Sequence, residues 1–187
     1  MKKILLVLAL TACAMPARAW HFSSNPYIGF EYGYALGEYK EDYLKDSYED
    51  KSGFWAVSIG MRASEYFGAE IFYQQLQTAD RGENNIKTEA GYYAYGIDFI
   101  GFLPSPDLSF SLLASAGAGM YKLEGKYRSA AQSYDYDKVT TGMRLGLGMQ
   151  YNMTQFLALR VMARYVLSDS EYLRNMYEFA GGVQITF

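Results

Sequence analysis

The sequence predicts an all-β protein, an eight-stranded antiparallel up-and-down transmembrane β-barrel. Three observations predict it: eight segments alternate between apolar and small or polar residues, the connections alternate between short and long, and the arginines within these segments share one face. The composition agrees, because glycine (18 residues) and tyrosine (19) are abundant and proline (4) is scarce, which favours strands over helices. A chain of 187 residues corresponds to one domain.

The clearest strand is the stretch "GMRLGLGMQYNM", residues 142–153. Every second side chain from Met143 to Tyr151 is apolar or aromatic, whereas the positions between them hold glycine, Arg144, Gln150 and Asn152. Strict alternation is typical of a β-strand with one apolar face. The same pattern recurs in residues 27–37, 55–63, 67–74, 92–102, 108–121, 156–167 and 177–187.

The connections between these segments alternate in length. Three are short, at residues 64–66, 103–108 and 152–155. Four are long and polar, at residues 37–53, 77–88, 122–138 and 168–175. This alternation places all short turns at one rim and all long loops at the other, which is the plan of an outer-membrane barrel.

The arginines decide which face meets lipid. An arginine that faces lipid near the bilayer midplane costs about 2–4 kcal/mol, so the glycine-rich face that carries them must point into the barrel. The same face carries four acids, which we expect to neutralise the arginines. Because Arg62 and Glu70 flank the first short turn, we expect these two to pair. The predicted interior charge network consists of Glu31, Arg62, Glu70, Asp98, Arg144, Arg160, Arg164 and Glu178.

The N-terminus predicts export. Lys2 and Lys3 precede an apolar stretch, and the small-residue site Ala17-Arg18-Ala19 follows, so we expect a signal peptide over residues 1–19 and a barrel domain over residues 20–187. The alternative is a lipoprotein box in "LTAC", with Cys13 as the acylated residue. Removal of residues 1–19 takes 3 of the 17 basic residues and leaves 14 against 20 acidic ones, which argues against a nucleic-acid partner.

Three stretches carry a resemblance to a known family: "YGIDFIGFLPSPDLSFSLLASAGAGMY", "GLGMQYNMTQFLALRVMARY" and the closing "GGVQITF". With them the chain resembles the small OmpA-like outer-membrane barrels of the OmpX and Ail type. The resemblance implies a location in the bacterial outer membrane, with membrane lipid around the barrel. It also implies that Val183, Ile185 and Phe187 form the C-terminal signal read by the barrel-assembly machinery.

The long loops are the candidate functional surface. The first, "GEYKEDYLKDSYEDKSG", combines acidic residues with Tyr39, Tyr43 and Tyr48, and residues 127–138 contain Tyr134 and Tyr136. Tyrosine supplies a large contact area at low entropic cost, so we expect a structural or adhesive role toward host-cell or matrix proteins, with the interior closed by its charges. The alternative is a narrow pore for ions or small solutes.

The sequence predicts no enzyme and no cofactor. The single histidine, His21, precedes the first strand, and no nucleophile, base and orienting acid share one predicted site. The acids of the first loop match no calcium-binding spacing, so no metal site is expected.

Overall fold

The computed structural model describes residues 25–39, 51–76, 79–83, 86–106, 109–128, 133–168 and 173–187. The predicted boundary between residues 19 and 20 lies outside them. No helix in the described part of the chain is long and apolar enough to cross a membrane. The strands are β1 (Asn25–Tyr39), β2 (Lys51–Arg62), β3 (Phe67–Leu76), β4 (Ala79–Glu83), β5 (Ile86–Pro104), β6 (Phe110–Arg128), β7 (Ser133–Asn152), β8 (Leu157–Ser168) and β9 (Leu173–Thr186).

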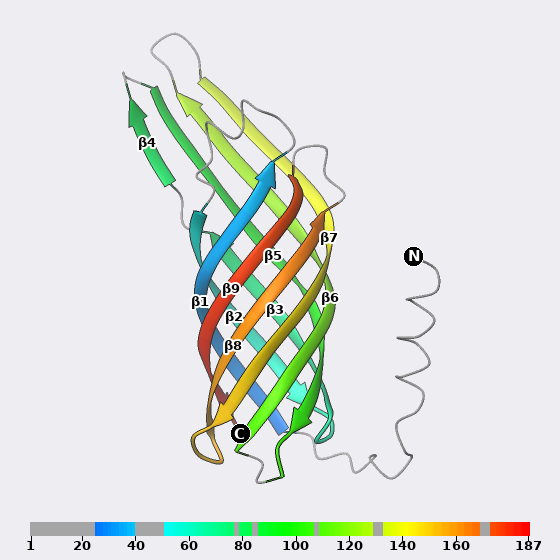
Figure 1. Cartoon of the computed structure of the whole chain (residues 1–187). Helices are drawn as coiled ribbons and strands as arrows, with labels where there is room; N and C mark the ends of the chain where they lie inside the picture. Colours follow the sequence, from blue (N-terminus) through cyan, green and yellow to red (C-terminus); the bar gives the residue numbers. More distant parts are fainter. Residues whose placement is uncertain are drawn as a thin grey trace.

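The sheet closes on itself (Figure 1). Neighbouring strands are antiparallel, β1 pairs with β9, and β3 pairs directly with β5. The predicted fold class is therefore confirmed: β1, β2, β3, β5, β6, β7, β8 and β9 form a closed eight-stranded barrel. The short strand β4 pairs with β5 alone and extends the sheet beyond the barrel.

The two faces of the wall carry different side chains. On β7, Leu147 points outward with 69% of its surface exposed, whereas Arg144 points inward with 1% exposed. On β3 the same contrast holds between Ile71 and Glu70, which are 66% and 3% exposed. Successive residues of a strand point to opposite faces, so the alternation in the sequence becomes an apolar outside and a mixed inside.

Two predicted long loops are wrong in extent. Residues 122–138 belong mostly to β6 and β7, which pair as far as Arg128 with Ser133, and residues 79–83 and 86–88 belong to β4 and β5. Figure 1 shows these strands rising beyond the ends of β1, β8 and β9. Residues 121–128 do alternate, but every second residue is charged and few of the others are aliphatic, so the stretch resembles a polar loop in the sequence.

The three short connections lie at one end of the barrel, which we call the short-turn end. The backbone N–H of Ala63 donates to Phe67 O at 2.9 Å, and Met153 N–H donates to Leu157 O at 2.9 Å. The C-terminus lies at this end too, because Phe187 N–H donates to Pro26 O at 2.9 Å. We call the opposite end, where β4 to β7 project, the long-hairpin end.

Candidate functional site: the barrel interior and its two ends

Inward-facing glycines leave room for charged side chains inside the barrel. A Cβ atom on Gly182 would lie 2.8 Å from Glu31 Cγ, and one on Gly117 would collide with Asp98 Oδ1. Because eight strands enclose little space, a wall of larger residues would exclude these carboxylates.

Glu31 lies between two arginines of β8. Arg164 Nη1 and Nη2 lie 2.6 and 2.9 Å from the two carboxylate oxygens of Glu31, and Arg160 Nη1 lies 3.9 Å from Oε1. A guanidinium that meets both oxygens of a carboxylate forms one of the stronger ionic contacts in proteins. This contact joins β8 to β1 across the interior.

Arg160 is the centre of a second cluster. Its Nη1 donates to Glu70 Oε2 at 2.8 Å, and its Nη2 donates to Gln184 Oε1. The hydroxyl of Tyr27 donates to the same Glu70 oxygen at 3.0 Å. These side chains come from β1, β3, β8 and β9, so the cluster ties together opposite walls.

Arg144 is the centre of a third cluster, in which the ion-pair distances are longer. Its Nε lies 3.6 Å from Asp98 Oδ2, and its Nη2 lies 3.6 Å from Glu178 Oε2. The guanidinium also stacks on Phe72, with Cζ 3.9 Å from the ring centre. Gln74 Nε2 donates to Glu178 Oε1 at 2.7 Å. Within the described residues, neither carboxylate oxygen of Asp98 accepts a hydrogen bond.

The expected pair between Arg62 and Glu70 is wrong. Arg62 Nη2 donates to the carbonyl oxygen of Glu65 at 2.6 Å, and its Nε donates to that of Ser64 at 3.3 Å. The guanidinium lies over Phe102, 4.2 Å from the ring centre. In the register of β2 and β3, Arg62 is opposite Gly68 and Glu70 is opposite Gly60, so the two are staggered. Arg62 therefore caps the turn, and Glu70 binds Arg160.

The structure thus brings seven of the eight predicted interior residues into one buried region and leaves Arg62 at the rim. Sequence reasoning missed Tyr27, Gln74 and Gln184 as members of the network. All three occupy inward positions of strands, so the alternation could have found them.

Apolar side chains also fill the interior. One cluster contains Ala35, Phe54, Ala56, Phe72, Leu76, Ala94, Tyr121, Val166, Met176 and Ala180. A smaller one contains Ile100, Phe102, Leu113 and Met162. Phe54, Ala94 and Val166 have no exposed surface. The apolar side chains alternate with charged and polar ones inside the barrel: Met162 lies between Arg160 and Arg164 on β8, and Phe72 lies between Glu70 and Gln74 on β3.

The remaining predicted residues lie at the edges. Val183, Ile185 and Phe187 point outward at the end of β9, 40%, 47% and 69% exposed. Of the loop tyrosines, Tyr39 ends β1 and Tyr134 and Tyr136 lie in β7. Tyr43 and Tyr48 lie outside the described residues. In the part of the chain that the structure describes, no three His, Cys, Asp or Glu side chains are grouped to hold a metal ion.

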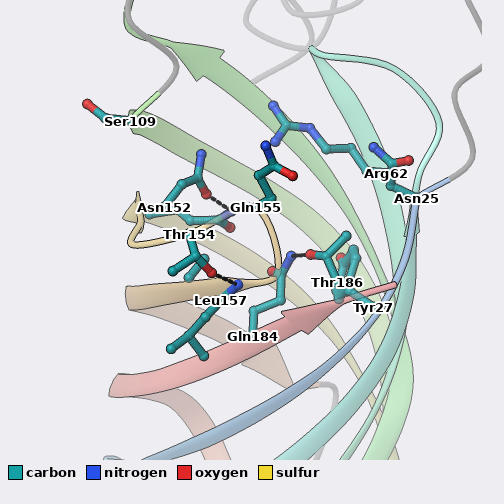
Figure 2. Close-up of a pocket in the computed structure, with 12 residues that line it drawn as sticks. Asn25, Tyr27, Arg62, Ser109, Asn152, Thr154, Gln155, Leu157, Gln184 and Thr186 are labelled. Carbon is teal, nitrogen blue, oxygen red and sulfur yellow. Dashed lines mark hydrogen bonds between the residues drawn. The ribbon is translucent and has the colours of Figure 1, made fainter.

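A polar cavity of about 370 Å³ opens at the short-turn end (Figure 2). Five amide side chains line it: Asn25, Gln150, Asn152, Gln155 and Gln184. Its one charged lining residue is Arg62, and Tyr27, which also lines it, is 1% exposed. Figure 2 shows Arg62 and Asn25 on one side, Asn152 and Thr154 on the other, and Gln184 beneath.

A family model described as outer membrane protein beta-barrel domain matches residues 4–187 of the chain. The chain belongs to this family. The resemblance to small outer-membrane barrels is thereby confirmed, and the strands of this outer-membrane barrel turn their large apolar side chains outward. Comparison with curated proteins finds no match.

Solved structures share the fold at low sequence identity. The Neisserial surface protein NspA is 15% identical with a TM-score of 0.62, over 87% of this chain and 97% of that one. The attachment invasion locus protein Ail of Yersinia pestis, in complex with the heparin analogue sucrose octasulfate, is 14% identical with a TM-score of 0.61, over 87% and 99%. The β-barrel domain of Pseudomonas aeruginosa OprF is 12% identical with a TM-score of 0.58, over 88% and 100%.

Proposed function

We propose that this outer-membrane barrel is a surface protein that binds an external protein through the sheet at its long-hairpin end. The charged interior closes the barrel and stabilises its wall. The observation that carries the proposal is a free sheet edge on β7. Pairing with β8 begins only where Gly142 meets Ser168, so residues 133–141 pair with β6 alone within the described part of the chain.

This edge is long enough to bind an extended peptide. At about 3.3 Å per residue, residues 133–141 span roughly 30 Å along the strand. An unpaired edge offers a row of N–H and C=O groups to which an extended segment of another protein can add as a further strand. Short turns of such barrels face the periplasm, so the long-hairpin end faces outward. The tyrosines of the first loop would add contact area.

The interior supports a closed barrel in preference to the pore alternative. Conduction needs a continuous path lined by polar groups or water. Here Phe54 and Val166 pack inside the barrel without exposed surface, and Arg144, which is opposite Val166 in the register of β7 and β8, is 1% exposed. Salt bridges such as that of Arg164 with Glu31 hold the charged side chains in place between the walls.

The proposal includes export, a lipid contact and no catalysis. A signal peptide over residues 1–19 would be removed, and Val183, Ile185 and Phe187 would serve as the signal for the barrel-assembly machinery. Membrane lipid would cover the outer face. The interior carboxylates face arginines and are buried, so a substrate has no route to them. That Ail, named for attachment and invasion, has the same fold is compatible with an adhesive role.

Two variants test the role of the long-hairpin end. The first replaces residues 123–138 by Asn-Gly, which joins the paired residues Lys122 and Val139 through a two-residue turn and removes six of the nine residues of the free edge. The second replaces residues 39–50 by a Gly/Ser linker, which long loops tolerate. Heat-modifiable gel mobility reports the fold, and binding of expressing cells to host cells and matrix proteins reports the function.

We expect the Asn-Gly variant to keep its mobility and to lose binding, and the linker variant to bind more weakly. Unchanged binding by the Asn-Gly variant would contradict the edge as the contact. A parent protein that does not bind but shows single-channel conductance in planar bilayers would replace the adhesive role by the pore.

A further inference from the structure

We propose that the polar cavity at the short-turn end is a binding site for a short peptide with a free terminal carboxylate. It lies at the end opposite the protruding sheet, so the proposal is independent of the adhesive role. Because the short turns of outer-membrane barrels face the periplasm, the ligand would come from that compartment.

The lining of the cavity selects for an anion. Arg62 is its one charged lining residue, and Glu65, the acid whose charge acts on this guanidinium, does not line the cavity. The hydrogen bonds of Arg62 to Ser64 and Glu65 use Nε and Nη2. They hold the guanidinium at the rim, and neither of them uses Nη1. A carboxylate can therefore bind Nη1 without breaking the turn.

Gln150 favours a ligand that also carries a hydrogen-bond donor, because its side chain offers a buried acceptor. Its side chain is 2% exposed, and its Nε2 donates to Asn152 Oδ1 at 3.0 Å. Its Oε1 accepts no hydrogen bond within the described part of the chain. A buried carbonyl oxygen without a donor has lost its hydrogen bonds to water and gained none in the protein, which costs free energy. A ligand N–H or O–H that donates to it would therefore be stabilised there.

These two features together favour a peptide terminus over a simple anion. Inorganic phosphate or acetate would satisfy Arg62 but brings no amide N–H to Gln150. A peptide carries a carboxylate and an N–H close together, and the other amides of the lining can pair with its backbone. The volume, about 370 Å³, lies at the lower end of the range for small-ligand sites and suits a ligand of two or three small residues.

The floor of the cavity is prearranged. Gln184 accepts a hydrogen bond from Arg160 and donates to Thr186 Oγ1 at 3.4 Å. Tyr27 is held by its hydrogen bond to Glu70. A site whose side chains are already oriented loses little conformational entropy when a ligand binds.

The test uses the full mature protein in detergent micelles and acetyl-Ala-Ala as the probe. Binding is measured by calorimetry and by the side-chain amide NMR signals of Gln150 and Gln184. The C-terminally amidated peptide is the control that removes the charge from the ligand. We expect the acid to bind and the amide to bind at least about tenfold more weakly, the effect of losing one charge-assisted hydrogen bond.

Variants test the residues. Arg62→Gln and Gln150→Leu should each weaken binding of the acid about tenfold or more. Lys122→Gln removes a cation at the other end of the barrel and should leave binding unchanged. Comparison of the L,L and D,D peptides identifies the source: a preference for L,L points to a polypeptide terminus and a preference for D,D to a cell-wall peptide.

Three results would overturn the proposal. The first is that the acid does not bind at concentrations up to about 10 mM, where binding would be too weak to be specific. The second is that the acid and the amide bind equally well. The third is that Lys122→Gln weakens binding of the acid as much as Arg62→Gln does. Because the amidated peptide changes the ligand and not the protein, the test remains decisive if Gln150→Leu does not fold.

Discussion

The identity of the partner of Glu70 can be measured with two double-mutant cycles. Glu70 is 3% exposed and receives hydrogen bonds from Arg160 at 2.8 Å and Tyr27 at 3.0 Å. Arg160→Met would leave this carboxylate buried with a tyrosine hydroxyl as its remaining donor. We expect the free energy of unfolding to fall by about 3–5 kcal/mol, the usual cost of an unpaired buried charge.

The companion variant Glu70→Gln keeps the shape and removes the charge. It should cost about 1.5–3 kcal/mol, since it weakens a hydrogen bond to a charged group. The double variant has no unpaired carboxylate, because Glu70→Gln removes the charge that Arg160→Met leaves without a partner. Its free energy of unfolding should therefore fall by about 1–3 kcal/mol less than the sum of the losses in the two single variants. The control cycle combines Arg62→Met with Glu70→Gln and should show coupling below about 0.5 kcal/mol.

Urea-induced unfolding in lipid vesicles, followed by tryptophan fluorescence, measures each free energy. Trp55 on β2 is an outward-facing reporter. Heat-modifiable mobility confirms that each variant is folded before the titration. Coupling below about 0.5 kcal/mol between Arg160 and Glu70, or equal coupling in the Arg62 cycle, would refute the arrangement of the interior described above.

Three further predictions concern the wall and the leader. Gly117→Ala should destabilise the barrel by about 1–3 kcal/mol in the same assay, because its Cβ would collide with Asp98, whereas Gly181→Ala, with nothing within 4 Å, should have little effect; equal losses would contradict the packing. Leu145→Arg on the outer face should cost about 2–4 kcal/mol, and an unchanged stability would mean that this face does not meet lipid. Mass spectrometry of the exported protein should give Trp20 as the first residue, and an acylated Cys13 would replace the predicted cleavage by lipidation.

The sequence by itself determined the barrel and the direction of its side chains. Alternation such as that of residues 142–153 has one structural solution when arginines occupy one set of positions and apolar residues the other. Arg144 cannot face lipid without a large cost, so it must face inward, and its neighbour Leu145 must face out. The short turns, such as residues 152–155, followed from the gaps between alternating segments. These features depend on local periodicity and on which residues are apolar, and both can be seen directly in the sequence.

Only the tertiary structure decided which charges meet. Glu70 binds Arg160, 90 positions away, and not the nearby Arg62, because the stagger of the closed sheet sets which inward side chains share a level. The projecting part of β7 likewise escaped prediction, because residues 133–138 contain no aliphatic side chain and resemble a polar loop in the sequence. A period of two residues predicts which way a side chain points, but not which side chain it meets on the opposite wall of the barrel. That depends on closure and register, which are properties of all eight strands together.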